Sequence, residues 1–476
     1  TYKKVNNQQT VHFKSPKSLK LFFYRRCSIT TLKMYRSVAE CYEGQSVFMT
    51  GGTGFLGKVI LEKLLYSCPG INKVFLLVRE KANATAQQRI QKILEQPLFS
   101  RLKNEKPQVL EKIVPIVGDI SEPKLGIKSE DEQLLINEAS IIIHSAATIK
   151  FNEPLEVAVN INVAGTGRVL NLCQRMKNVK AFVYVSTAFS NTNRKVIEEV
   201  VYPAPASLNE VKKLLEIGIK EDQVKELIRG RPNTYTYTKA LAENLVAENH
   251  GSVPTVIIRP SIVSSSKIEP EVGWIDNWFG ASALITMIAK GLNRVILTTP
   301  TNTLDLIPVD YVSNLIIVSA AKCESSQDVK VYNSCTSVEN PIRMQQLADI
   351  VIADSYKHKF YDVPMPSVYF TKFKWIVFLM TLILQTIPAY IADIFLLVTG
   401  QKTRYTKIQA RISLVRDTLE YFTSNNWLIY APKTRALAES LSSSDRSHFP
   451  CDPTDIDWEE YIPTYCQGIR QYLIKT

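Results

Sequence analysis

Short apolar runs alternate with helical segments between residues 46 and 260. The runs are rich in Val, Ile and Phe, and their apolar character is continuous instead of alternating. Such strands are typical of a parallel sheet that is covered by helices on both faces. The sequence therefore predicts an α/β fold with a doubly wound parallel sheet of the Rossmann type. The six predicted strands are residues 46–50, 73–79, 113–119, 140–147, 181–187 and 255–260.

Two connections in this pattern are long. Residues 80–112 and 190–231 each separate two strands, and the second contains a Lys/Glu-rich helical pattern. We interpret these charges as the solvated face of a surface helix.

Composition limits the functions to consider. The chain has 476 residues, of which 45% are hydrophobic and 21% are charged, enough for two packed domains. Most of the net charge of +12 comes from the first 33 residues, which contain eight Lys or Arg and no acid. The remainder is only slightly basic, which suits an anionic cofactor or acyl carrier and predicts no nucleic-acid partner. Met34 is a candidate biological start, and we favour a non-native or flexible extension over a targeting peptide.

Cysteine and histidine positions bear on metals and redox state. Eight cysteines are scattered without a C-x-x-C pair, and five histidines are widely spread. This pattern predicts a reducing compartment, with neither a disulfide framework nor a metal site.

The stretch VFMTGGTGFLGK, residues 47–58, joins the first predicted strand to a helical pattern. In such a unit the first of three spaced glycines permits a tight turn, the second lets the backbone approach a pyrophosphate, and the third lets the helix pack on the strand. The diphosphate then lies at the positive end of the helix. A purely structural turn is the alternative, but we predict that Gly51, Gly54 and Gly57 hold a dinucleotide.

Residues that follow the later strands indicate which dinucleotide is bound. Arg79 ends the second strand, where NAD enzymes usually carry an acid for the ribose 2′-hydroxyl. A guanidinium there can bind a 2′-phosphate, which favours NADPH. Asp119 follows the third strand, where adenine is expected, and Ala147 follows the fourth, beside the nicotinamide ribose.

The stretch NTYTYTKALAEN, residues 233–244, carries candidate acid–base chemistry. Tyr235 and Lys239 are four residues apart and therefore share a helix face. A nearby ammonium favours the charged form of a phenol, whose pKa is ordinarily about 10, so the pair suits proton exchange near neutrality. Lys239 would also hold the ribose. Tyr237 competes as the acid but lacks a lysine four residues on, and an incidental pair on an amphipathic helix is the alternative.

VSTAF supplies two hydroxyls, Ser186 and Thr187, at the end of the fifth strand. A hydroxyl there can donate to a substrate carbonyl oxygen beside the phenol. Either hydroxyl can instead be structural, and we favour Thr187 as the catalytic one.

Taken together, TGGTGFLG, Arg79, VSTA, YTYTK and RPSIV (259–263) resemble the extended short-chain dehydrogenase/reductase family. Residues 269–280, 306–314 and 331–342 narrow the resemblance to fatty acyl-CoA reductases. From about residue 345 the chain is similar to the helical C-terminal domain of that family. The resemblance implies a basic N-terminal extension (1–43), a reductase domain (44–344) and a helical domain (345–476).

The resemblance also implies an activity. It is the NADPH-dependent reduction of a long-chain fatty acyl-CoA to a primary alcohol, with release of CoA, through an enzyme-bound aldehyde. By position, Thr187, Tyr235 and Lys239 would be catalytic, with Thr187 and Tyr235 polarising the thioester carbonyl. The residues that would hold the cofactor are Gly51, Thr53, Gly54, Phe55, Leu56, Gly57, Arg79, Asp119, Ala147 and Lys239.

Residues 374–400 suggest contact with a membrane. The segment is long enough to cross a bilayer, but Gln385, Pro388 and Asp393 interrupt it. We favour a monotopic hairpin with Pro388 at the turn, the polar side chains turned inward or toward headgroups, and both basic flanks on the cytosolic side. A buried helix that lines the acyl pocket and a true span are the alternatives. We expect a membrane-associated, cytosol-facing enzyme of the endoplasmic reticulum or peroxisome.

Two other functions stay open. An enzyme of the same fold that acts on a sterol or a nucleotide sugar is disfavoured by the region beyond 345. An inactive membrane scaffold that binds the cofactor is disfavoured by the presence of Thr187, Tyr235 and Lys239.

Overall fold

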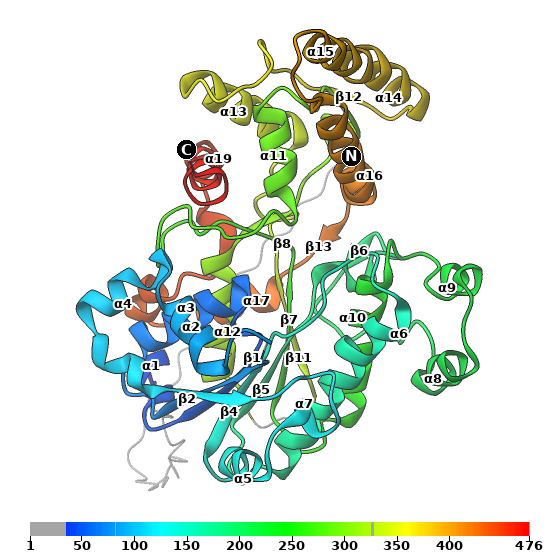
Figure 1. The fold of residues 1–476 in the computed structure, drawn as a ribbon. Coiled ribbons are helices and arrows are strands. Elements are labelled where there is room, and N and C mark those ends of the chain that lie inside the picture. The colour runs from blue at the N-terminus through cyan, green and yellow to red at the C-terminus, as the bar shows by residue number, and fades with distance from the viewer. Residues whose placement is uncertain (1–34, 81, 325–327, 476) are drawn as a thin grey trace, which may run out of the picture. The chain divides into compact units, whose positions relative to one another are not determined.

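Seven parallel strands form the central sheet, in the order β11–β7–β5–β4–β1–β2–β3 (Figure 1). All six predicted strands are present, and β11 (Lys330–Ser334) adds a seventh beside β7. The strand order reverses between β1 and β4, and in open α/β sheets ligands bind at such a switch point, beyond the carboxyl ends of the strands. The predicted doubly wound α/β fold is confirmed. The six strands are β1 (Ser46–Thr50), β2 (Lys73–Val78), β3 (Ile113–Val117), β4 (Ala139–His144), β5 (Ala181–Val185) and β7 (Thr255–Pro260).

The computed structural model describes residues 35–80, 82–324 and 328–475. The basic segment and the candidate start at Met34 lie outside the described residues. Residues 37–476 form one compact unit. Helix α1 (Val38–Tyr42), which precedes the predicted domain boundary at residue 44, packs in the core of this unit, and the Tyr42 hydroxyl donates to the carbonyl oxygen of Ile317 at 2.9 Å.

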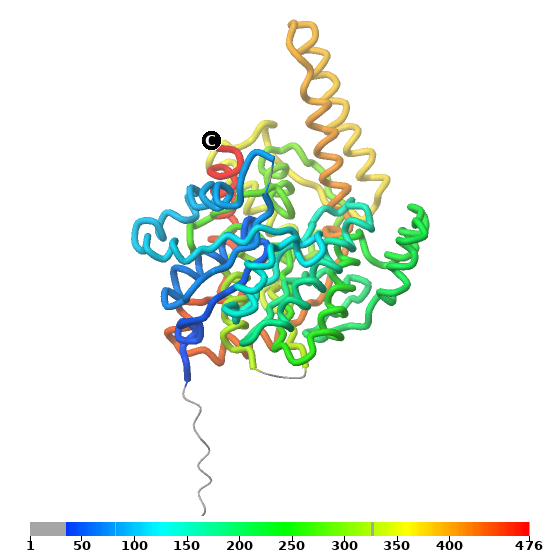
Figure 2. Tube along the Cα trace, turned by 60° about the horizontal axis from the view of Figure 1, so that its bottom comes forward, coloured from blue at the N-terminus to red at the C-terminus, as the bar shows by residue number. Residues whose placement is uncertain are grey.

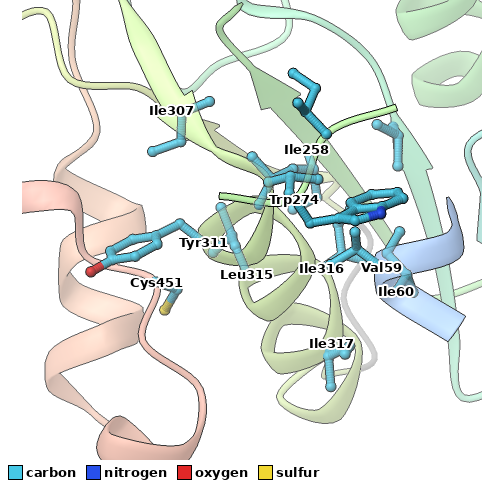
Figure 3. Packing of buried hydrophobic residues seen from close by; sticks show 14 of the residues in the cluster. Val59, Ile60, Ile258, Trp274, Ile307, Tyr311, Leu315, Ile316, Ile317 and Cys451 are labelled. Atoms are coloured by element: carbon cyan, nitrogen blue, oxygen red, sulfur yellow. The ribbon is translucent and has the colours of Figure 1, made fainter. Parts of the chain in front are cut away.

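Helices cover both faces of the sheet because alternate strand residues point in opposite directions. Along β1, Val47 and Met49 belong to one buried cluster and Phe48 belongs to the other. Helix α12 (Val309–Ala321) packs beside α2 (Phe55–Ser67) in the first cluster, as Figure 3 shows. The second cluster contains residues of α5 (Ser129–Glu138), α7 (Gly165–Arg175) and α10 (Thr234–Asn249).

Both long connections contain short helices. Residues 80–112 hold α3 (Ala86–Leu94) and α4 (Ser100–Glu105). The Lys/Glu-rich pattern forms α8 (Leu208–Ile217) and α9 (Glu221–Leu227), and α9 buries none of its side chains, as expected for a solvated helix. Strand β6 (Val196–Ile197) precedes these two helices in the second connection.

The region beyond residue 344 is mainly helical, as predicted, and it is packed into the same unit as the sheet. Strand β13 (Leu428–Ile429) pairs in parallel with β6, and the Tyr461 hydroxyl donates to the carbonyl oxygen of Ser265 at 2.7 Å. The remaining helices and strands are α6 (Leu155–Val159), β8 (Ile262–Ser264), α11 (Ala281–Ala289), β9 (Val295–Leu297), β10 (Leu306–Pro308), α13 (Met344–Lys357), β12 (Tyr369–Thr371), α16 (Tyr405–Ser424), α17 (Pro432–Glu439), α18 (Ser443–His448) and α19 (Trp458–Gly468).

The apolar segment forms one continuous helix, Lys374–Val398, of 25 residues. It consists of α14 (Lys374–Thr381), a π-helical segment η6 (Leu382–Thr386) and α15 (Ile387–Val398). The predicted turn at Pro388 is therefore wrong. A widened π-turn just before the proline accommodates its ring and its missing amide, so the helix continues. The basic flanks lie at opposite ends of this helix.

The chain turns instead between α15 and α16, and α16 runs back beside the apolar helix (Figure 2). The Asp393 carboxylate accepts hydrogen bonds from the backbone amides of Arg404, Tyr405 and Thr406, each at 2.9 Å. Gln385 is also buried. Both interrupting polar side chains therefore point inward, as predicted, and Asp393 caps the start of α16.

Candidate active site

The turn between β1 and α2 is packed so closely against the rest of the protein that side chains would clash there. Gly51 has φ +76°, and a Cβ there would lie 2.6 Å from the amide nitrogen of Ala146. A Cβ on Gly57 would lie 2.2 Å from the carbonyl oxygen of Gly51, so this residue must be glycine for α2 to approach the turn. A Cβ on Gly52, which the sequence analysis did not single out, would lie 2.1 Å from Cδ1 of Leu76, the end of a side chain and not backbone, so this glycine is less constrained.

Helix α2 begins at this turn with an open N-terminus. Gly54 is its N-cap, and no side chain caps the helix. The first amides of an α-helix have no intrahelical acceptor, and here Phe55 and Leu56 carry two of them. Thr53, Phe55 and Leu56 are half-buried, whereas Gly54 is exposed. A side-chain-poor turn with unpaired amides fits the diphosphate of a dinucleotide.

Two guanidinium groups meet at the end of β2. Arg79 is largely exposed, and its Nη1 lies 3.5 Å from Oδ2 of Asp119. Arg89 on α3 donates a hydrogen bond to the carbonyl oxygen of Arg79. Burial lowers the pKa of Arg89, and the nearby charge of Arg79 lowers it further. Sequence analysis missed Arg89 because it lies inside a long connection, at no spacing that a motif specifies.

The carboxylate of Asp119 is held in place at the end of β3. Its Oδ1 accepts from the amide and the hydroxyl of Ser121, at 2.9 and 2.8 Å. Ala147 lies in the loop after β4. Asn162 holds this loop, because its side chain accepts from the Thr148 amide at 2.9 Å and donates to the Thr148 carbonyl oxygen at 3.2 Å. Asn162 lies in a π-helical turn, η4 (Asn160–Ala164), which the sequence patterns did not predict.

Helix α10 carries Tyr235 and Lys239. The Nζ of Lys239 donates to the carbonyl oxygen of Val185 at 2.6 Å and lies 4.4 Å from the ring centre of Tyr184. Burial lowers the pKa of Lys239 to about 7, and the Glu243 carboxylate opposes this shift. Burial raises the pKa of Tyr235 to about 12, and a hydrogen bond with Thr187 opposes that shift.

The electrostatic expectation for this pair is therefore wrong in sign. The sequence analysis expected the Lys239 ammonium to favour ionisation of the phenol. In the structure the cost of burying a phenolate dominates, and Lys239 itself is readily deprotonated. Tyr235 is consequently a protonated hydrogen-bond donor at neutral pH.

The two hydroxyls of the VSTAF stretch have different partners. Ser186 donates to Oε1 of Glu243 at 2.5 Å, and Glu243 is also paired with the buried Arg259 through Oε2 and Nη2 at 2.7 Å. The Thr187 hydroxyl makes only long contacts, with the carbonyl oxygen of Pro260 at 3.4 Å and the amide of Phe189 at 3.3 Å, besides its bond to Tyr235. This arrangement favours Thr187 as the hydroxyl that is available to a substrate.

Tyr237 has a different environment from Tyr235. Its side chain is fully buried in the second core cluster, and its hydroxyl has no hydrogen-bond partner among the described residues. This environment disfavours Tyr237 as the acid.

Metal and thiol chemistry have little support in the described part of the chain. Among those residues, no three His, Cys, Asp or Glu side chains are grouped so that they could hold a metal ion. The seven cysteines described there are free thiols.

The sheet with its switch point, the glycine turn and the matching family model define an oxidoreductase that binds a nicotinamide dinucleotide, of the extended short-chain dehydrogenase/reductase type. Family models described as male sterility protein match residues 49–316 and 384–476. Fatty acyl-CoA reductase 1 of Homo sapiens is 39% identical over 444 residues, which cover 92% of this chain and 86% of that protein. Fatty acyl-CoA reductase 2 of Mus musculus is 37% identical with the same coverage. The chain belongs to the fatty acyl-CoA reductase family.

Solved structures share the fold. The reductase domain of a nonribosomal peptide synthetase from Mycobacterium tuberculosis superimposes with a TM-score of 0.61 at 18% identity, covering 92% of this chain and 96% of that one. UDP-glucuronic acid 4-epimerase from Bacillus cereus, solved in complex with NAD, gives a TM-score of 0.51 at 14% identity, covering 91% and 99%. The similarity to the epimerase concerns the fold and not the substrate.

Proposed function

We propose that this chain reduces a long-chain fatty acyl-CoA to the primary alcohol with NADPH and releases CoA. The observation that carries the proposal is that the Tyr235 and Thr187 hydroxyls lie near each other at the carboxyl end of β5, close enough for Thr187 to affect the pKa of Tyr235. The names of the relatives support the choice of substrate.

The first step follows from the two hydroxyls. Tyr235 and Thr187 donate hydrogen bonds to the thioester carbonyl oxygen, where negative charge develops during reduction. Tyr235 is protonated at neutral pH and can transfer its proton to that oxygen. The Tyr235 phenolate then takes the proton back from the hydroxyl of the resulting hemithioacetal as the C–S bond breaks, so CoA leaves as the thiolate and an aldehyde remains. A second reduction at the same two hydroxyls yields the alcohol.

The cofactor is proposed to lie across the switch point. Its diphosphate would be held by the turn Gly51–Gly57, its adenine end by Asp119, and its nicotinamide ribose by Ala147 and Lys239. When bound, the dinucleotide supplies the hydride. A Lys239 ammonium with a pKa of about 7 can donate to the ribose and can also give up a proton near neutrality.

The preference for NADPH is proposed from the two guanidinium groups at the end of β2. Arg79 is exposed and only loosely paired with Asp119, so it is free to fork onto a 2′-phosphate. Arg89 adds a second positive charge next to it.

We also propose that the apolar helix binds a membrane. It spans about 37 Å, longer than the ~30 Å hydrocarbon core, yet α16 runs back along it and ends beside Phe151, whose ring contacts that of Tyr235. If the apolar helix crossed the whole bilayer, α16 would be separated from the catalytic site. We therefore favour a hairpin formed by the apolar helix and α16 that inserts into one face of the bilayer. The exposed apolar residues of this helix are Trp375, Phe378, Leu379, Leu382, Ile383, Leu384, Ile387, Tyr390, Ile391, Ile394, Phe395, Leu397 and Val398. A cytosol-facing membrane of the endoplasmic reticulum or peroxisome is the predicted location.

The function is tested with purified protein, hexadecanoyl-CoA and NADPH, followed by mass spectrometry of the products. We expect hexadecanol and free CoA, with two NADPH consumed for each alcohol. Turnover of a sterol or nucleotide sugar with no alcohol formed from acyl-CoA would contradict the proposal. Cofactor binding without any turnover would favour the inactive scaffold.

A further inference from the structure

Residues 266–277, between β8 and α11, close into a loop beside helix α2, which we call the α2-facing loop. The Ser266 amide donates to the Trp274 carbonyl oxygen at 3.1 Å, and the Trp274 amide donates to the Ser266 hydroxyl at 2.9 Å. The Gly273 amide donates to the Ser266 carbonyl oxygen at 2.9 Å. These bonds fix the backbone around Trp274, whose side chain is buried.

Charged side chains hold the α2-facing loop against α2. Lys58 and Lys63 of α2 are buried, and their ammonium groups pair with the carboxylates of Asp276 and Glu269, respectively. Arg101 joins the second pair, with its Nη1 2.9 Å from Oε2 of Glu269. Because a buried charge without its partner destabilises the fold, these pairs fix the loop to the helix at two points.

The Trp274 ring contacts the first residue of α2, which is Phe55. The two ring centres are 5.3 Å apart, and the planes are inclined by only 22°. The Nζ of Lys58, three residues further along α2, lies 5.3 Å from the Trp274 ring centre. Trp274 also belongs to the packed cluster that contains Val59 and Ile60 of the same helix, as Figure 3 shows. One indole therefore packs against the first turn of α2.

This end of α2 needs a restraint from outside the helix because no side chain caps it. The first amides of a helix have no intrahelical acceptor, and the end of a helix without a cap frays. Fraying would turn the Phe55 and Leu56 amides away from a bound diphosphate. Ordering them again on binding would then weaken the affinity for the dinucleotide.

We propose that Trp274 is a positioning residue for the cofactor, which acts through Phe55 and holds the first amides of α2 in the geometry that binds the diphosphate. The inference rests on the proposed placement of the diphosphate at the turn Gly51–Gly57. NADPH and NADH carry the same diphosphate, so Trp274 affects the binding of both alike. Arg79, by contrast, distinguishes the two through the 2′-phosphate.

The test measures the Kd of NADPH and of NADH in Trp274→Leu, through the fluorescence of the reduced nicotinamide. Loss of the stacked ring should raise both values about 10-fold and by the same factor. The kcat for alcohol formation at saturating NADPH should stay within about twofold of wild type, because Tyr235 and Thr187 are untouched. Trp274→Phe, which keeps an aromatic ring, should recover most of the affinity. Trp278→Leu, at an exposed position four residues along the chain, is the matched control and should change neither Kd.

A double-mutant cycle with Phe55→Leu separates positioning from a general loss of packing. If the two rings act as one unit, the double variant should bind NADPH within about twofold of the weaker single variant. Losses that multiply would overturn the role of the ring pair. Urea unfolding shows that each variant is folded, and Trp274→Phe and Phe55→Leu carry the test if Trp274→Leu does not fold.

A Kd for NADPH within about twofold of wild type in folded Trp274→Leu would also overturn the inference, as would a loss confined to NADPH. If wild type binds NADPH but forms no alcohol from hexadecanoyl-CoA, the proposed activity fails, and the binding measurements still decide the role of Trp274. If wild type does not bind NADPH, the proposed cofactor site and this inference fail together.

Discussion

Tyr235 and Tyr237 are two residues apart on α10, and the structure assigns their hydroxyls opposite energetic roles. The Tyr235 side chain is half-buried, and its hydroxyl lies near that of Thr187. The Tyr237 hydroxyl is fully buried and has no partner among the described residues. Replacing each tyrosine with phenylalanine removes only the hydroxyl, so the pair of variants separates catalysis from stability.

Tyr235→Phe should lower kcat for alcohol formation about 100-fold or more, because it removes the proton donor and one of the two donors to the developing oxyanion. In free energy this is about 3 kcal/mol of transition-state stabilisation. The effect on folding should be small, about 1 kcal/mol for one neutral hydrogen bond. The affinity for NADPH should be nearly unchanged.

Tyr237→Phe should do the reverse. A buried hydroxyl without a partner costs the folded state roughly 1–3 kcal/mol, so its removal should leave the protein as stable as wild type or more so. The rate of alcohol formation should not change.

Three measurements on the same preparations decide the matter: the rate of hexadecanol formation, NADPH binding followed by fluorescence, and urea unfolding. The reasoning is refuted if Tyr237→Phe is the less active variant. It is also refuted if Tyr235→Phe keeps more than about a tenth of the wild-type rate.

Further predictions concern the cofactor and the buried lysine. Arg79→Ala should raise KM for NADPH about 10-fold or more with much less effect on NADH, because only NADPH carries the 2′-phosphate; equal changes in steady-state assays would exclude that role. Gly57→Ala should abolish NADPH binding in a fluorescence titration, because a Cβ would lie 2.2 Å from the Gly51 carbonyl oxygen; normal affinity would contradict this packing. For Lys239, whose pKa is lowered by burial to about 7, the unfolded chain binds more protons between pH 7 and about 10, so the free energy of unfolding rises with pH. In Lys239→Met the free energy of unfolding, measured with urea, should differ less between pH 7 and pH 9 than it does in wild type. An unchanged difference would mean that another group titrates.

Local patterns were sufficient for part of the site and for six of the seven strands of the sheet, though not for β11. These six strands could be predicted because burial on both faces demands unbroken apolar runs. Gly51, Gly54 and Gly57 could be predicted because a tight turn and a close helix leave no room for side chains. The shared face of Tyr235 and Lys239 follows from helical periodicity alone.

Other features depend on residues that meet only in the folded chain. Ser186 and Thr187 look alike in the sequence. Only the folded chain shows that the Ser186 hydroxyl donates to Glu243, which is paired with Arg259. The sign of the Tyr235 pKa shift depends on how deeply the ring is buried, which spacing does not reveal. Arg89 reaches Arg79 only because of the path that the connection takes.

The C-terminal helices show the same division most clearly. Hydrophobicity alone identified residues 374–400 as an apolar segment, and local proline preferences then predicted a turn at Pro388 that does not occur. Local preferences are worth a few kcal/mol, and a π-turn next to the proline, with α16 packed alongside, outweighs them. The placement of Phe422 beside Phe151 could come only from the tertiary structure, because the two rings belong to segments separated by most of the chain and are joined by packing, not by any local pattern.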